Sequence, residues 1–135
     1  MRRQVREWIK DLLESFHPQD GDRVYNLIVE WTHDQLEIYI RITKERVTFG
    51  YGAIQWDGPH SPVPTKIDKY SLDRQELELA IDRSEMLLDY MIKTINSRKR
   101  QYRFCQFCHK KFPPEHRFDS KTCHGCASKE YFVVY

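Results

Sequence analysis

The sequence predicts an α+β fold, in which a helix, a three-stranded antiparallel meander and a long helix form a body that a small C-terminal module follows. Three observations support this prediction. Apolar spacing changes from helical to alternating and back, prolines and glycines separate the segments, and all four cysteines lie in the last quarter of the chain. With 135 residues, 40% of them apolar, the chain is long enough for one modest core but not for two full domains.

The first helix is predicted before His17. Apolar residues recur there at the spacing of three and four that places them on one helix face, namely Val5, Trp8, Ile9, Leu12, Leu13 and Phe16. The residue before a proline avoids the helical conformation, so His17-Pro18 and the polar run 19–22 are expected to end this helix.

The meander is predicted between Val24 and Gln55, where apolar residues recur at every second position. One face carries Leu27, Val29, Trp31, Leu36, Ile38, Ile40, Ile42, Val47, Phe49 and Tyr51. The breaks at 33–34 and 44–45 are short enough for hairpins, so three consecutive strands are expected to pair. Gly50 and Gly52 suggest a bulge or bend in the third strand.

The segment 56–70 is expected to be an ordered surface loop, because its composition disfavours a hydrogen-bonded ladder. It contains Pro59, Pro62 and Pro64 with Gly58 and Ser61.

A long helix is expected next, capped by Ser71 or by Asp73, the latter with Glu76 at capping-box spacing. Its apolar stripe consists of Leu77, Ile81, Leu88, Met91, Ile92 and Ile95. Together with the first helix, this stripe should cover the buried face of the meander. The helix is expected to lead into a polar basic hinge at 97–101.

The predicted domain division is an α+β body at 1–97, followed by a basic hinge and a cysteine-bearing module at 98–135. Charge divides in the same way. The body carries 13 Lys and Arg against 17 Asp and Glu, a net −4, whereas residues 98–135 carry 9 against 3, a net +6. This asymmetry indicates an anionic partner for the tail, or a tail that docks on its own acidic body.

The chain begins with a charged amphipathic pattern and contains no uninterrupted apolar run of signal-peptide or membrane-span type. We therefore expect a soluble, cytoplasmic protein without a membrane partner. A reducing cytoplasm keeps thiols free, so the cysteines are expected to bind a metal and not to form disulfides.

The four cysteines Cys105, Cys108, Cys123 and Cys126 form the pattern CxxC-x14-CxxC. Two residues between cysteines let one turn direct both sulfurs at the same ion, and two such turns complete a tetrahedron. The sequence therefore predicts one structural Zn²⁺, although a rubredoxin-like iron centre uses the same ligands. Four thiolates leave no open coordination position, so a metallohydrolase is not expected.

The motifs Cys105-Gln-Phe-Cys108 and Cys123-His-Gly-Cys126, with their flanking residues, resemble the treble-clef and zinc-ribbon class of zinc fingers over residues 102–135. The resemblance implies a small metal-stabilised module that binds DNA, RNA or protein. A short helix opening at 127–130 would match a treble clef, which we favour, and a strand at 131–135 would match a ribbon. His109 and His124 adjoin the cysteines, where either would replace a thiolate, hydrogen-bond to one, or remain a solvated turn residue.

Six cations of the tail are candidate nucleic-acid contacts: Arg98, Lys99, Arg100, Arg103, Lys110 and Lys111. They alternate with Tyr102, Phe104 and Phe107, and cations beside rings are typical of surfaces that bind single strands. The alternative is that the rings, with Phe112, pack beneath the metal turns while the cations stay solvated.

An active site is not indicated. Asp57 with His60, or His33 with Asp34, would be acid–base pairs, but no nucleophile, oxyanion donor or phosphate-binding loop accompanies them. No small-molecule substrate is expected either.

The expected function is that of a non-enzymatic, zinc-binding, nucleic-acid-associated regulator or accessory protein. The alternative is a protein-binding adaptor or inhibitor in which zinc is purely structural. Its anchors would lie on the outer face of the sheet, where we expect Tyr25, Glu37, Tyr39 and Arg41, with Trp56 just beyond.

Overall fold

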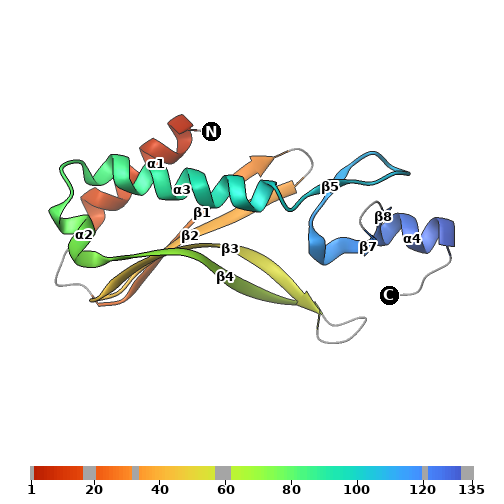
Figure 1. The fold of residues 1–135 in the computed structure, drawn as a ribbon, viewed down its shortest axis with the longest axis horizontal. Helices are drawn as coiled ribbons and strands as arrows, with labels where there is room; N and C mark the ends of the chain where they lie inside the picture. The colour runs from red at the N-terminus through yellow and green to blue at the C-terminus, as the bar shows by residue number, and fades with distance from the viewer. Residues whose placement is uncertain (1, 17–20, 32–33, 57–61, 120–121, 132–135) are drawn as a thin grey trace.

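A computed structural model describes residues 2–16, 21–31, 34–56, 62–119 and 122–131. It has two layers, a four-stranded antiparallel sheet and a pair of helices on one face of that sheet (Figure 1). The cysteine-bearing tail lies beyond the C-terminal end of the longer helix. The mixed helix-and-sheet class is therefore confirmed, while its details differ from the expected arrangement.

The first helix, α1 (Arg2–Ser15), agrees with the prediction. It buries Val5, Ile9 and Leu12, which are spaced by four and three residues along one face. This stripe packs against α3 (Arg83–Lys99) and against the sheet, so α1 closes one side of the core.

The sheet consists of β1 (Arg23–Trp31), β2 (Asp34–Ile42), β3 (Arg46–Trp56) and β4 (Pro62–Asp73), in that order. The first three strands form the predicted meander, with Leu27 opposite Ile38 and Ile40 opposite Phe49. These alternating residues are buried beneath the helices, which confirms the predicted core face.

The loop predicted at 56–70 is wrong, because residues 62–73 form the fourth strand β4. Prolines are tolerated there because β4 is an edge strand, paired on one side only, so a missing N–H need not interrupt a ladder. For that reason the prolines indicated a loop in a segment that is a strand. Gly58, Pro59 and Ser61 lie outside the described residues.

The expected irregularity at Gly50 is present, but the extra residue belongs to β4. Phe49 is opposite Tyr70 and Gly50 is opposite Asp68, which leaves Lys69 as the bulged residue. A Cβ at Gly50 would collide with the carbonyl oxygen of Ile67 and with the ring of Tyr39. Glycine is required here because the two strands and a tyrosine ring meet closely.

The outer-face anchors differ from the expectation at two positions. Tyr39 is fully buried, because its ring covers Gly50 and its hydroxyl donates a hydrogen bond to Asp68. Tyr25 is paired with Ile40 and packs against the core, so it belongs to the inner face. Two tyrosines proposed as exposed anchors are therefore structural. Arg41 stays on the outer face and pairs with Asp68 at 3.3 Å.

The single long helix is also wrong in detail, because two helices, α2 (Arg74–Leu79) and α3, replace it. The break precedes Asp82, whose side chain accepts a hydrogen bond of 3.2 Å from the backbone N–H of Glu85 and caps α3. Asp73 precedes α2 without a side-chain cap. Ile81, expected in the apolar stripe, lies in the break and is fully exposed.

The other stripe residues are buried as predicted, namely Leu77, Leu88, Met91, Ile92 and Ile95. Helix α3 continues to Lys99, so its last turn includes Arg98 and passes the expected boundary after residue 97. The division into a body and a tail module stays a prediction. Among the described helices, none combines the length and apolar character needed to cross a membrane.

The tail is built from short elements: β5 (Arg103–Phe104), β6 (Lys111–Phe112), η1 (Pro114–His116), β7 (Arg117–Asp119), β8 (Thr122–Cys123) and α4 (His124–Tyr131). Strands β5 and β6 form one hairpin, and β7 and β8 form another. A helix, α4, is present near the position expected for one, but it begins at His124 and contains Cys126, earlier than the expected start at 127–130.

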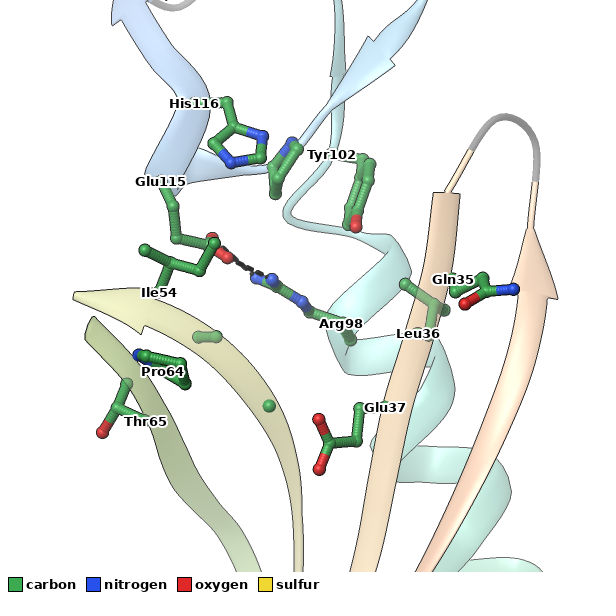
Figure 2. A pocket seen from close by; sticks show the side chains of 13 residues that line it. Gln35, Leu36, Glu37, Ile54, Pro64, Thr65, Arg98, Tyr102, Glu115 and His116 are labelled. Atoms are coloured by element: carbon green, nitrogen blue, oxygen red, sulfur yellow. Dashed lines mark hydrogen bonds and ion pairs between the residues drawn. The ribbon is translucent and has the colours of Figure 1, made fainter. Parts of the chain in front are cut away.

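The sheet divides at the end nearest the tail. The β2–β3 ladder stops at Ile38 and Tyr51, whereas β1–β2 continues to Trp31 and Asp34. Strands β3 and β4 likewise stay paired to the end of β3. Between the two separated hairpins lies a cleft of about 220 Å³, which the 3-10 helix η1 of the tail borders (Figure 2).

Candidate metal centre and basic surface

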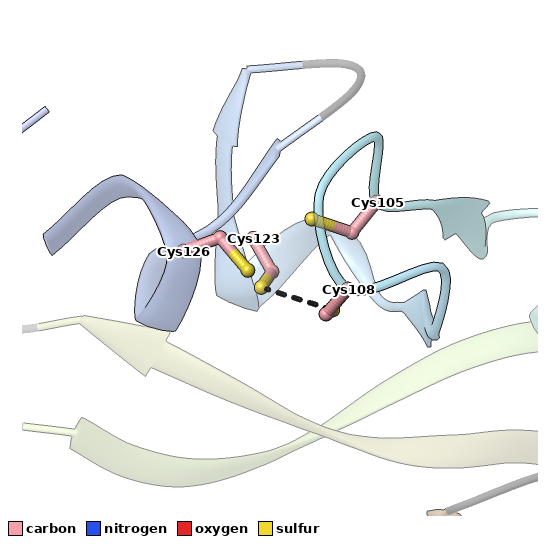
Figure 3. A group of neighbouring side chains, drawn as sticks. All are labelled: Cys105, Cys108, Cys123 and Cys126. Carbon is pink, nitrogen blue, oxygen red and sulfur yellow. Dashed lines mark hydrogen bonds between the residues drawn. The ribbon is translucent and has the colours of Figure 1, made fainter. Parts of the chain in front are cut away.

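The four cysteine sulfurs converge at one point. Their Sγ atoms all lie within 4.8 Å of one another, and the Sγ atoms of Cys108 and Cys123 are 4.0 Å apart (Figure 3). A tetrahedral ion with metal–sulfur bonds of about 2.3 Å requires sulfurs roughly 3.8 Å apart. The cluster is thus close to the geometry that holds one metal ion, and a slight contraction completes it.

The first cysteine pair is positioned by the β5–β6 hairpin. Cys105 donates its backbone N–H to the carbonyl of Lys110 at 2.9 Å, and His109 donates to the carbonyl of Cys105 at 3.0 Å. His109 adopts a left-handed conformation with φ of 60°. That conformation lets the chain reverse within the turn, so Cys105 and Cys108 present their sulfurs on the same side.

The second pair spans the junction between a strand and a helix. Cys123 ends β8, and Cys126 lies in the first turn of α4, one turn further along. A hydrogen bond of 2.8 Å from Nε2 of Gln106 to Oγ1 of Thr122 joins the two halves of the site. Thr122 is buried, so this bond fixes the strand that carries Cys123.

The thiols differ in acidity. Burial opposes ionisation of Cys105, but backbone N–H groups of Cys108, Cys123 and Phe107 donate to its sulfur and lower its pKa to about 6. Burial and the neighbouring sulfurs raise the pKa of Cys126 to about 12, and burial raises that of Cys123. Since four thiolates at this spacing repel one another, binding of a cation must accompany release of the remaining protons.

No histidine joins the cluster within the described part of the chain. His109 is exposed on its turn, and the rings of His116 and His124 face each other with centroids 6.3 Å apart. The donor set is therefore four sulfurs, which are the ligands of structural zinc and of rubredoxin-like iron.

Arg98 is buried and is not one of the exposed cations. Its guanidinium pairs with the carboxylate of Glu115 (Figure 2). It also donates a hydrogen bond of 3.0 Å to Oε1 of Gln101. It also lies over the rings of Tyr51 and Tyr102, at 4.9 and 5.5 Å from their centroids. The prediction that Arg98 contacts phosphate conflicts with this position, because a phosphate would have to displace Glu115.

Glu115 was not singled out from the sequence. Burial raises its pKa, but hydrogen bonds from Arg98 and from the backbone N–H of Ile54 outweigh burial, and the net pKa is lowered. The available signal was a rare acidic residue in a basic tail, since only Glu115 and Asp119 are acidic between Cys108 and Cys123.

The other predicted contacts lie at the surface in and around the first hairpin. Arg100, Arg103 and Lys110 are exposed, and Arg103 donates to the carbonyl of Arg100 at 2.8 Å. Lys99 and Lys111 are half-buried, since both lie against the ring of Trp31. The fold thus brings five of the six cations to the outside of the tail and the end of α3.

The aromatic residues of the tail divide into two groups. Tyr102 and Phe112 are buried, as the packing alternative requires. Phe104 and Phe107 are 64% and 38% exposed, so they do not serve mainly as core. Phe104 is the more exposed of the two rings, and the ammonium of Lys111 lies 5.0 Å from its centroid.

The structure does not describe the side-chain geometry of the acid–base pairs named from the sequence. His33, Asp57 and His60 lie outside the described residues, and only the backbone of Asp34 is described. Comparison of the chain with family models, with curated proteins and with solved structures found no match.

Proposed function

We propose that this protein is a non-enzymatic, nucleic-acid-associated accessory or regulatory protein whose C-terminal zinc finger presents cations to phosphates. The observation that carries the proposal is the grouping of five surface cations with the exposed ring of Phe104 around the first metal hairpin. Cations supply sequence-independent affinity for phosphates, and an exposed ring adds a stacking surface.

Zinc is the metal that we propose for the cysteine cluster. Four thiolates in a closed tetrahedron form a typical structural zinc site, and such a site leaves no position for substrate. The metal would hold the hairpin β5–β6 against β8 and α4, because each half supplies two sulfurs. A reducing cytoplasm would keep these thiols available.

A treble clef is the zinc-finger class that we propose. A metal-binding turn in a hairpin, a second hairpin, and a helix that supplies the last ligand from its first turn are the parts of that class. Here β5–β6, β7–β8 and α4 follow in that order, and Cys126 lies in the first turn of α4. A zinc ribbon would require a strand after the second pair, where α4 lies.

The charge distribution supports the same function. A Zn(Cys)₄ centre carries a formal −2, so a tail of +6 keeps about +4 after metal binding. The carboxylate of Glu115 pairs with Arg98. It therefore offsets the charge of a buried arginine, and the surface cations keep most of the positive charge of the tail. The acidic body would keep nucleic acid on the tail.

The test is binding of labelled single- and double-stranded DNA and RNA at several salt concentrations. Wild-type affinity should fall steeply as salt rises, and a quadruple variant should bind more weakly. In a plot of log affinity against log salt concentration, the slope for the variant should be flatter by up to about 0.7–0.9 per lost contact. The variant carries Lys99→Gln, Arg100→Gln, Arg103→Gln and Lys110→Gln. Arg98 is left in place because its loss would leave Glu115 buried and unpaired.

A second quadruple variant is the matched control for net charge. It changes four exposed cations of the body, namely Arg2, Lys10, Lys44 and Lys69, to Gln. Affinity should change little in this variant. Equal losses in both variants would show non-specific attraction to total charge, and no binding by the wild type at low salt would end the proposal.

One observation favours the alternative adaptor function. Within the residues that the structure describes, no helix lies over the outer face of the sheet (Figure 1). Val24 and Ile28 of β1 are 43% and 47% exposed on that face. Exposed aliphatic residues beside Arg41 and Glu37 are suited to a protein partner. If the protein is an adaptor, the double variant Val24→Ser with Ile28→Ser should no longer bind the protein partner, whereas the quadruple tail variant should still bind it.

A further inference from the structure

We infer that the nucleic-acid surface is shared between the tail and the body, and that it selects single strands through Trp31 and Phe104, with Lys111 between them. This inference rests on the proposed function and goes beyond it. It adds a residue of β1 to the site and names the class of nucleic acid that the site takes.

Lys111 joins the two rings. Its ammonium nitrogen lies 4.6 Å from the ring centroid of Trp31 and 5.0 Å from that of Phe104. No ion pair of Lys111 is present within the described part of the chain, where its ammonium instead lies against two ring faces. An ammonium held in this way is oriented in advance for a phosphate, because the rings restrict it without neutralising it.

Trp31 is held in a defined orientation by the start of the tail. The ring of Tyr102 meets it edge to face, with centroids 4.9 Å apart and planes at 78°. Tyr102 is buried, so this contact is part of the packing between β1 and the tail. The ammonium of Lys99, 5.3 Å from the same ring, brings a second cation to the tryptophan.

Phe104 supplies the ring that a base can reach. Its side chain is 64% exposed, although it lies in β5 directly before Cys105, a position where an apolar side chain could be buried. The backbone of β5 is paired with β6, so the ring projects from a hairpin that the proposed zinc ion would stabilise through Cys105 and Cys108. An exposed ring beside an oriented ammonium has the two parts of a nucleotide-binding position.

This geometry favours the binding of single strands over the binding of duplexes. Bases in a duplex are stacked on one another, so a protruding phenylalanine finds no free base face without unstacking a step. A single strand offers the face of any base, and stacking on an aromatic side chain is largely independent of sequence. Cations alone would not make this distinction, since both forms carry phosphates.

The experiment measures affinity for an oligothymidylate of about 12 nucleotides and for a duplex of the same length. Wild type should bind the single strand more tightly, and Phe104→Ala should weaken that binding about tenfold while changing duplex binding much less. Trp31→Leu should also weaken single-strand binding severalfold, and Trp31→Phe should restore most of it because a ring face is retained.

Two controls separate stacking from general damage. Leu79→Ala removes an apolar side chain that is even more exposed than Phe104 from α2, at the opposite end of the molecule, and should not change affinity (Figure 1). Metal content and circular dichroism of each variant report folding. Phe104→Ala should pass both tests because its side chain is mostly in solvent, so it decides the question even if Trp31→Leu folds poorly.

Intrinsic fluorescence provides an independent readout. Oligothymidylate should quench the wild-type emission, and Trp31→Phe should lose most of that quenching although Trp8 and Trp56 remain. Single-strand binding that is unchanged in Phe104→Ala would overturn this inference alone, as would tighter duplex binding by the wild type. Absence of any nucleic-acid binding would overturn the proposed function with it.

Discussion

The guanidinium of Arg98, in the last turn of α3, is paired with the carboxylate of Glu115, which lies between the two cysteine pairs. Both side chains are enclosed, at 6% and 11% exposure. The backbone N–H of Ile54 in β3 donates to the same carboxylate. One acidic residue of the tail therefore bonds to a helix and a strand of the body, so the tail and the body are packed together through a buried charge pair.

Breaking this pair should destabilise the whole protein. Glu115→Ala leaves the Arg98 guanidinium buried without its carboxylate, and such losses cost about 3–5 kcal/mol. Replacing both partners, as Arg98→Met with Glu115→Leu, should recover most of that stability because no unpaired charge remains. Urea unfolding of the wild type and of these two variants gives the comparison. A single variant as stable as wild type would show that the pair is not formed in solution.

The same carboxylate should make stability depend on acid pH. The folded-state pKa of Glu115 lies below its usual value, so its contribution is present above the unfolded pKa of about 4.3 and is lost as pH falls through the lower folded value. Unfolding free energies measured between about pH 6 and pH 3 should therefore converge for wild type and Glu115→Gln. Parallel pH profiles would argue against a depressed pKa.

Removal of the metal should affect the tail first and the body second. Elemental analysis should find one zinc per chain, and chelation or Cys123→Ser should disorder 102–135, because structural zinc contributes about 10–16 kcal/mol in small modules. The body should keep its helices and strands but melt at a lower temperature, since Glu115 leaves Arg98. Hydrogen exchange resolved along the chain measures both effects. Bound iron, or a body unchanged in melting temperature, would contradict them.

His109→Gly tests the role of a histidine beside the metal ligands. With φ of 60°, this position favours glycine, so the substitution should raise stability by up to about 1 kcal/mol without reducing zinc affinity. His109→Val should have the opposite effect on stability, because a β-branched residue tolerates that conformation poorly. Competition with a zinc chelator measures the affinity. Weaker zinc binding by His109→Gly would indicate that the imidazole is a ligand.

Gly50→Ala should be strongly destabilising for a steric reason. The added Cβ meets the carbonyl oxygen of Ile67 and the ring of Tyr39, and overpacking of this kind costs about 1–3 kcal/mol or more. Gly21→Ala is the matched control, since nothing lies within 4 Å of a Cβ at that site. Thermal unfolding of both variants checks the difference. Equal melting temperatures would show that β3 and β4 can separate at the bulge.

The features predicted correctly are those that depend on neighbours in the chain. Helical spacing from Val5 to Leu12 and alternation through β1, β2 and β3 place side chains on one face whatever the rest of the protein does. The CxxC spacing acts in the same local way, because a single turn sets the separation of two sulfurs. The cluster of four cysteines and the core of the sheet followed from these patterns.

Predictions from local sequence patterns were wrong where the contact between two distant segments decides the structure. Prolines in 62–64 indicated a loop, but an edge position removes the need for their missing N–H groups, and only the neighbouring β3 provides that position. The continuous stripe from Leu77 to Ile95 suggested one helix, but Asp82 caps a new one. Tyr39 was expected to be exposed on the outer face, and Gly50 of the next strand buries it.

The sequence by itself determined the α+β composition, the inner face of the meander and the pairing of cysteines within each CxxC turn, since each follows from spacing within a few residues. Tertiary structure alone decided that Arg98 is buried against Glu115, and that Trp31 lies beside Lys111 and Phe104. These pairs are 17 and about 80 residues apart in the chain. The free energy of a buried charge or of an exposed ring depends on what surrounds it, and only the folded chain supplies those surroundings.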